Sequence, residues 1–208
     1  MDFISLMEII GTIAFAVTGA LVAIEKDLDY YGIIFLGVVT AVGGGIMRDV
    51  LIGLEIPKSL ANPNFVFMSV ATCIVVIGFY SHIKYMDRLI TLCDALGLAA
   101  FTAIGSLAAV RAGYDHTFII VTTAMFTGIG GGIVRDVCAG RVPFVFEKEV
   151  YAVASMIGAI AFALARDYVP HTLVMYISFG VTFALRMVSV KFDIHLPKVK
   201  KKDIKADE

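Results

Sequence analysis

Long apolar segments alternate with short polar or turn-forming stretches along most of this 208-residue chain. A membrane-spanning helix needs roughly 20 predominantly apolar residues. Seven segments meet that requirement, and we expect a transmembrane helix over each of residues 3–24, 31–54, 63–81, 89–111, 117–139, 149–166 and 170–190. The pattern therefore predicts an all-α membrane protein with seven spans.

The composition agrees with a membrane protein and narrows the function classes. Only 17% of residues are charged and 59% are hydrophobic, whereas a soluble domain carries about 25% charged residues. The one basic run lies in the tail and has no interleaved aromatic residues, so we expect no nucleic-acid partner. No Cys-x-x-Cys, Ser-His-Asp or metal-ligand spacing occurs in the sequence. We therefore expect neither an enzyme nor a bound metal or cofactor.

An internal repeat organises the chain. The sequence Gly-Gly-Gly-Ile-x-Arg-Asp-Val, here called the glycine phrase, occupies residues 43–50 and returns 87 residues later at 130–137. Upstream, an acid, two glycines and a phenylalanine recur 86 residues apart, namely Glu8, Gly11, Phe15 and Gly19 with Asp94, Gly97, Phe101 and Gly105. Three spans thus repeat as the next three. Because three is odd, the second copy must enter the membrane from the opposite side, which predicts inverted repeats.

The repeat divides the chain into four parts, each given by its residues. We expect a first three-helix repeat at 1–85, a second at 86–168, a seventh helix at 169–192 and a basic cytoplasmic tail at 193–208. Lys and Arg are more frequent on the side that carries the tail, which places the C-terminus in the cytoplasm and the N-terminus outside.

The glycine phrase falls near the middle of the second and fifth spans. Consecutive glycines weaken a helix by about 1 kcal/mol each relative to alanine, so we expect both helices to be broken there. The carbonyl groups freed at Gly43, Gly44, Gly45, Gly130, Gly131 and Gly132, together with the hydroxyls of Thr40 and Thr127, would then line a path for a small cation. The alternative is that the glycines only allow the helices to pack closely.

Each glycine phrase ends in an arginine and an aspartate inside an apolar segment. Charges placed there are costly and usually mark a functional interior. Neighbours on a helix do not face each other, so we expect pairs across the repeats, Arg48 with Asp136 and Arg135 with Asp49. The alternative is pairing with nearby helix ends or lipid headgroups.

Other charged residues are expected at the membrane surface. We place Glu8 and Asp94 there as helix N-terminal acids, and we expect Arg186 to reach the cytoplasmic surface with its long side chain. Lys148 and Glu149 open the sixth span, where an interfacial position or a part in gating is open to them.

The doubled glycine phrase, with Gly140-Arg141-Val142-Pro143 and Glu149-Val150-Tyr151-Ala152, resembles the bacterial membrane family of paired glycine-transporter-type domains. Over about residues 4–190 the chain is similar to the prokaryotic branch of the TRIC (trimeric intracellular cation) channels. The resemblance implies two inverted triplets plus one helix, a homotrimer among membrane lipids in the bacterial inner membrane, and one potassium- and sodium-permeable pore per protomer. In animal TRIC channels a Lys-Glu-Val motif precedes the second glycine phrase, whereas Lys148-Glu149-Val150 follows it here. We therefore transfer no lipid-binding role to these residues.

Three functions stay open at this point. A cation channel requires the arginines near its path to be neutralised, because free positive charge opposes cation entry. A secondary transporter for glycine or another small zwitterion would use an arginine for the carboxylate and an aspartate for the amine. In a purely structural membrane protein, whose glycines only pack, the costly buried charges would have no explanation.

Overall fold

The computed structural model describes residues 3–147 and 150–194, all of them in helices and the turns between helices. The helices are α1 (Phe3–Glu25), α2 (Tyr30–Leu51), α3 (Lys58–Ala61), α4 (Asn64–Phe79), the 3-10 turn η1 (Tyr80–His82), α5 (Met86–Arg111), α6 (Thr117–Cys138), α7 (Phe144–Glu147), α8 (Val150–Ala165) and α9 (His171–Lys191).

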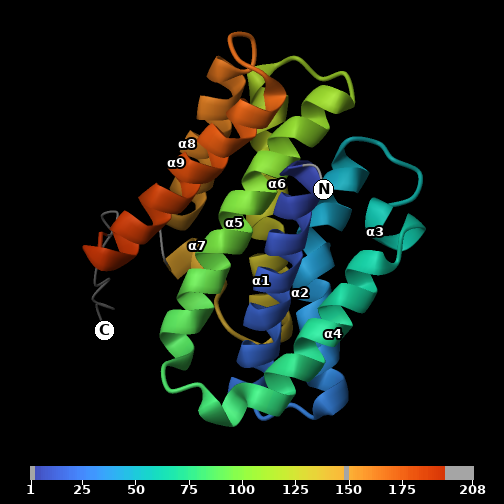
Figure 1. The fold of residues 1–208 in the computed structure, drawn as a ribbon, viewed down its shortest axis with the longest axis vertical. Coiled ribbons are helices and arrows are strands. Elements are labelled where there is room, and N and C mark those ends of the chain that lie inside the picture. Colours follow the sequence, from blue (N-terminus) through green and yellow to red (C-terminus); the bar gives the residue numbers. More distant parts are fainter. Residues whose placement is uncertain (1–2, 148–149, 195–208) are drawn as a thin grey trace, which may run out of the picture.

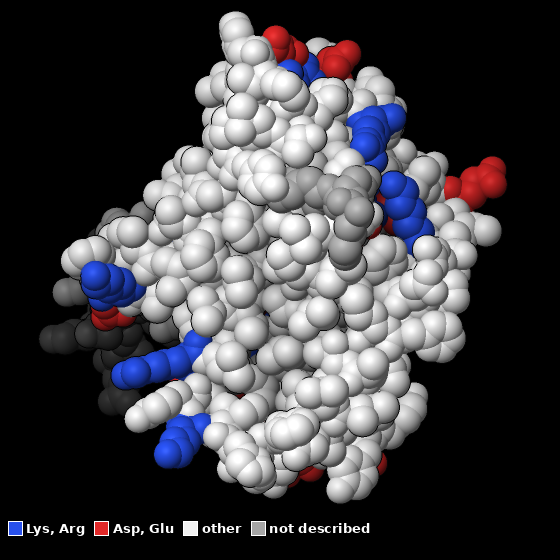
Figure 2. All heavy atoms as spheres, in the orientation of Figure 1, with Lys and Arg blue, Asp and Glu red and all other residues white. Residues whose placement is uncertain are grey.

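Each predicted span coincides with one apolar helix. Six of the described helices are long and apolar enough to cross a membrane, and α8 is shorter, with 16 residues. At 1.5 Å per residue α8 is about 24 Å long, against a hydrocarbon core of about 30 Å. In the view of Figure 2, charged side chains gather near the ends of the molecule and leave the broad surface between them uncharged, as a lipid-facing surface requires.

The second triplet of long helices is inverted relative to the first. In Figure 1, α1 runs down from the N-terminus, α2 returns upward and α4 descends. Helix α5 then rises, α6 descends and α8 rises, so each runs opposite to its counterpart in the first triplet. Helix α9 descends to the C-terminal end. The helix directions in this view agree with the predicted inversion.

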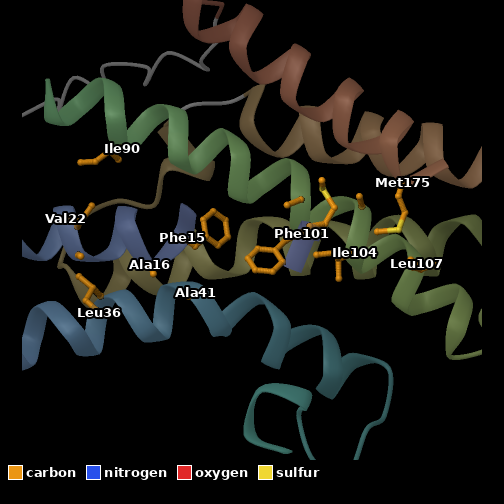
Figure 3. Close-up of a cluster of buried hydrophobic side chains, with 14 of the residues drawn as sticks. Phe15, Ala16, Val22, Leu36, Ala41, Ile90, Phe101, Ile104, Leu107 and Met175 are labelled. Atoms are coloured by element: carbon orange, nitrogen blue, oxygen red, sulfur yellow. The ribbon is translucent and has the colours of Figure 1, made fainter. Parts of the chain in front are cut away.

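Reciprocal contacts between the two repeats are those expected from a pseudo-two-fold axis. The rings of Phe15 and Phe101 lie side by side between α1 and α5, with centroids 5.3 Å apart (Figure 3). A Cβ on Gly11 would meet the ring of Phe101 at 3.1 Å, and a Cβ on Gly97 would overlap the ring of Phe15. When residue i contacts residue j of the other copy, and j contacts i in return, the interface is self-complementary. Each repeat thus supplies the aromatic ring that fills the other's glycine gap.

Both glycine-phrase helices end in the same way. After α2, Gly53 adopts φ +78°, and after α6, Gly140 adopts φ +66°. Gly53 and the next residue, Leu54, donate backbone hydrogen bonds to the carbonyls of Val50 and Asp49. The pattern recurs 87 residues later, and it is the Schellman arrangement that closes helix C-termini with a glycine. The sharp turn brings each following short helix, α3 or α7, back beside the charged end of the phrase.

Candidate functional site

Helices α2 and α6 run unbroken through their glycine phrases and cross there. A Cβ on Gly44 would overlap the carbonyl oxygen of Thr127, and a Cβ on Gly131 would overlap that of Thr40. Only glycine allows two backbones to approach this closely. The predicted break is therefore wrong, and the alternative of close packing holds. Because both helices are continuous, the glycine carbonyls stay within the helical hydrogen-bond ladder.

The members of each glycine triplet differ in their surroundings. In the first triplet, a Cβ on Gly43 would come no closer than 3.4 Å to Val134, and one on Gly45 no closer than 3.8 Å to Arg48. Gly44, between them, lies at the crossing. In the second triplet, a Cβ on Gly130 would lie 2.7 Å from the sulfur of Met47, and one on Gly132 would lie 3.2 Å from the hydroxyl of Tyr151.

The two predicted threonines also lie at the crossing, but their hydroxyl protons are engaged. Thr40 donates to the carbonyl of Leu36, and Thr127 donates to that of Thr123 at 2.6 Å. Both side chains are fully buried. The crossing is therefore a dry, closed contact in this structure.

Each arginine pairs with the aspartate of its own phrase. Arg48 Nε donates to Asp49 Oδ1 at 2.8 Å, and Arg135 Nε donates to Asp136 Oδ1 at 2.8 Å. The second carboxylate oxygen of each aspartate accepts a backbone N–H, from Lys58 at 2.7 Å or from Phe144 at 2.9 Å. Each aspartate thus ties the end of its long helix to the first residue of α3 or α7. The predicted pairs across the repeats are wrong, and pairing with a nearby helix end holds.

The antiparallel crossing explains why the two charged ends do not meet. Arg48 lies four residues beyond Gly44 on α2, and Arg135 lies four residues beyond Gly131 on α6. At 1.5 Å per residue each arginine is about 6 Å from the crossing, in opposite directions. The two charged ends are therefore about 12 Å apart along the bundle, one toward each end of the molecule.

Asp94 supplies a second carboxylate to the second repeat. It is the ninth residue of α5, and its Oδ1 accepts from Arg135 at 2.7 Å. The side chains of Asp94, Arg135 and Asp136 are all 0% exposed. The expectation of an interfacial helix N-terminal acid is wrong for Asp94. The signal for its role was present in the repeat, because a buried arginine needs a buried counter-charge and Asp94 recurs with the phrase.

Further side chains close the charged end of the second repeat. Arg141 Nε donates to Asp136 Oδ1 at 2.9 Å, and its Nη1 lies 3.6 Å from Glu25 Oε2 on α1. The guanidinium groups of Arg135 and Arg141 lie 5.0 and 4.8 Å from the centre of the Phe144 ring. Stacking of this kind stabilises a desolvated cation. Sequence reasoning had not assigned Arg141 or Phe144 to the site.

The charged end of the first repeat is hollow instead. A cavity of about 50 Å³ lies between α1, α2, α3, α4 and α5, and Glu8, Arg48, Asp49 and Lys58 line it together with Phe101. This volume accommodates more than one water molecule. The cavity reaches from Lys58 and Ser59 on α3 to Gly45, next to the crossing. Its existence was not predicted from the sequence.

One aromatic pair accounts for part of this difference between the repeats. Phe65 on α4 and Tyr151 on α8 occupy equivalent positions, 86 residues apart. Phe65 lines the cavity, whereas Tyr151 is only 1% exposed and directs its hydroxyl toward Gly132. Lys148 and Glu149, which were considered for an interfacial or gating role, lie outside the described residues, as does the tail from residue 195.

Nothing in the described part of the chain gathers three or more His, Cys, Asp or Glu side chains into a possible metal site. The charged groups of the two phrases take part in ion pairs and hydrogen bonds. In chemical terms, the arrangement holds two neutralised guanidinium groups at opposite ends of a closed helix crossing.

Comparison with known sequences matches both halves of the chain to one family. The family described as Glycine transporter matches twice, over residues 5–81 and 91–167. The UPF0126 membrane protein YvgT of Bacillus subtilis is 39% identical over 194 residues, covering 92% of this chain and 94% of the relative. The UPF0126 inner membrane protein YadS of Escherichia coli is 33% identical, with 92% and 93% covered.

Comparison with solved structures identifies the fold. A prokaryotic TRIC channel, solved in 0.5 M KCl, matches with a TM-score of 0.87 and 33% identity, covering 93% of this chain and 98% of the other. The TRIC trimeric intracellular cation channel orthologue from Rhodobacter sphaeroides matches with a TM-score of 0.89 and 29% identity, covering 93% and 100%.

Proposed function

Because this chain belongs to the UPF0126 family of membrane proteins with two glycine transporter domains, and has the fold of the prokaryotic TRIC channels, we propose that it is a monovalent cation channel permeable to potassium and sodium. Each protomer would hold its own pore between α2 and α6. The relative from Rhodobacter sphaeroides is described as trimeric, and the Escherichia coli relative as an inner membrane protein. We extend both properties to this chain, as a homotrimer in a bacterial inner membrane that moves ions without catalysing a reaction.

The observation that carries the proposal is the cavity at Glu8, Arg48 and Asp49. It leads from the predicted outer side of the bundle to the glycine crossing. The guanidinium of Arg48 is held by Asp49, with both Nε and Nη2 at 2.8 Å from Oδ1. A cation entering the cavity therefore meets a neutralised arginine and the further carboxylate of Glu8. This arrangement removes the objection that an arginine beside the path opposes cation entry.

The proposed path is closed at the crossing in this structure. Conduction would require α2 and α6 to separate or bend at Gly44 and Gly131, where no side chain lies between the two backbones. Glycines are the positions at which a helix deforms with the least loss of stability. The crossing would then act as the gate, and the cavity as the outer half of the pore.

A zwitterion transporter is the second candidate, because the same cavity offers an arginine and carboxylates. The geometry supports this function less well. A substrate carboxylate would have to compete with Asp49, which already occupies the Nε side of the Arg48 guanidinium. Bidentate binding of a carboxylate needs two free N–H groups on one side of the fork.

Recording from purified protein in planar bilayers tests the proposal. We expect unitary current steps in potassium solution without any added solute. Glu8→Gln should lower the unitary conductance at low salt, and high salt should reduce the difference through screening. Glu55→Gln is the matched control, because Glu55 is an exposed glutamate on the loop after α2 and does not line the cavity. Silent bilayers, together with saturable glycine uptake by proteoliposomes that follows an ion gradient, would replace the channel by the transporter.

A further inference from the structure

A second cavity, separate from the proposed pore, lies near the C-terminal end of α9. Its volume is about 110 Å³, and Thr91 of α5, Phe144 of α7, Val150 of α8, and Arg186 and Ser189 of α9 line it. This space is large enough for several water molecules and for a tetrahedral group of similar bulk. The cavity is more than twice as large as the one beside Arg48.

Arg186 is a buried cation that forms no ion pair with another residue of the described ranges 3–147 and 150–194. Its residue surface is only 4% exposed, so the expectation that it reaches the membrane surface is wrong. Nε has no hydrogen-bond partner, and Arg186 takes part in none of the ion pairs between described residues. Its guanidinium lies 5.1 Å from the centre of the Tyr151 ring, which stabilises a cation only partly. An isolated buried charge is strongly unfavourable, so a counter-charge is required.

The carboxylates near this arginine do not supply that charge. Asp94 accepts a hydrogen bond from Arg135 through Oδ1, and its Oδ2 has no hydrogen-bond partner among the described residues, Arg186 included. Asp136 accepts from Arg135 and Arg141. Asp193 also lines the cavity and has an interaction of its own, and none of the ion pairs between described residues joins it to Arg186. The cavity therefore presents an arginine that the carboxylates of the described residues leave unpaired.

We propose that this cavity binds a phosphate-bearing anion, with the phosphate oxygens accepting hydrogen bonds from the Arg186 guanidinium. Arginine binds phosphate through two parallel N–H groups and is the side chain best suited to that task. The group comes either from an anionic phospholipid headgroup or from free phosphate. The inference does not depend on the channel proposal.

The position of the cavity suits a lipid headgroup as the source. Arg186 lies five residues before the end of α9, about 7.5 Å along the helix, which is the depth of the headgroup region. Figure 2 shows Lys and Arg side chains gathered at the lower left, over the start of α5 and the end of α9 in the view of Figure 1. Exposed basic residues on these elements include Lys84, Arg88 and Lys191, and such clusters attract anionic lipids.

Binding to the full-length, delipidated protein in a neutral detergent tests the site. One arm titrates inorganic phosphate against chloride at equal ionic strength, and the other titrates phosphatidylglycerol against phosphatidylcholine. Native mass spectrometry and the melting temperature report binding. Arg186→Gln should weaken binding about tenfold, the loss expected for one buried charge-assisted contact. Arg186→Lys should retain part of it, and Arg88→Gln, an exposed arginine at the same end, is the matched control.

The outcomes separate the sources and decide the proposal. A rise in melting temperature with phosphate alone shows that the free anion suffices, whereas a rise only with phosphatidylglycerol identifies the headgroup. Either result supports the site if the rise in melting temperature is lost in Arg186→Gln and kept in Arg88→Gln. Equal effects of phosphate and chloride, together with equal retention of the two lipids by the wild-type protein, overturn the proposal without reference to any variant.

Discussion

Replacing one glycine at a time in the first triplet distinguishes a packing contact from a hinge. Gly44→Ala places a methyl group where the Thr127 carbonyl lies, whereas Gly43→Ala and Gly45→Ala place it at ordinary contact distances of 3.4 and 3.8 Å from their nearest neighbours. All three substitutions stiffen α2 equally, because each adds the same helix propensity. Only the central one also disturbs the crossing with α6.

The expected difference in stability between the variants follows from helix propensity and from overpacking. Glycine to alanine inside a helix is worth about 1 kcal/mol of stabilisation. Overpacking a tight contact costs about 1–3 kcal/mol, and a backbone carbonyl cannot turn away as a flexible side chain can. The stiffening is common to the variants, so Gly44→Ala should be less stable than Gly45→Ala by about 1–3 kcal/mol. Gly45→Ala itself should equal or exceed the wild type.

Thermal unfolding of the purified protein in detergent, followed by size-exclusion chromatography of the surviving fraction, measures this order. By the scaling for soluble domains of this size, the difference in melting temperature is about 2–12 °C. Gly131→Ala should repeat the loss, since its Cβ would overlap the Thr40 carbonyl. Equal shifts for Gly43→Ala, Gly44→Ala and Gly45→Ala would refute the packing account and return the triplet to the role of a hinge.

Three further predictions follow from the same geometry. Asp94→Asn breaks a fully buried ion pair with Arg135 and should lower the free energy of unfolding by about 3 kcal/mol in the same melting assay. Glu8→Gln, at a half-buried position, should lower it by less than about 1 kcal/mol. Equal losses of stability in the two variants would contradict the argument from burial. Lys58 is the first residue of α3, where proline is compatible with a helix, and its backbone N–H donates to Asp49. Lys58→Pro removes this N–H, so the variant should be less stable than Lys58→Ala by about 1–3 kcal/mol. Equal stability of the two variants would show that this hydrogen bond does not stabilise the protein. In a cysteine-free chain, a membrane-impermeant maleimide should label Asp115→Cys in intact cells and leave Lys26→Cys unlabelled until lysis, and the reverse result would invert the predicted orientation.

The sequence predicts the fold well because the relevant signals are periodic and duplicated. Apolar length locates each long helix, and the constant spacing of Gly11, Phe15, Gly97 and Phe101 marks equivalent faces. The odd number of spans per repeat then requires inversion. These arguments depend on the length of the apolar segments and on the number of spans per repeat, and neither changes with the tertiary contacts.

The site is less predictable because it depends on what each residue meets. Local propensity marks three consecutive glycines as weak helix, yet the partner backbone stabilises the helix by packing on them. Symmetry suggested that the charged ends of Arg48 and Arg135 meet, although an antiparallel crossing separates them. The cavity beside Arg48 depends on the side chains around it, including Phe65 where the second repeat has Tyr151.

The reciprocal filling of Gly11 by Phe101 and of Gly97 by Phe15 has an evolutionary consequence. Neither three-helix half can complete its own interior, but two identical halves inserted in opposite orientations would complete each other through the same contacts. An ancestor with a single repeat would therefore have had to enter the membrane both ways, with little Lys and Arg bias in its loops. Fusion of two such genes would have freed each half to change separately, one keeping a hollow beside its arginine and the other filling it.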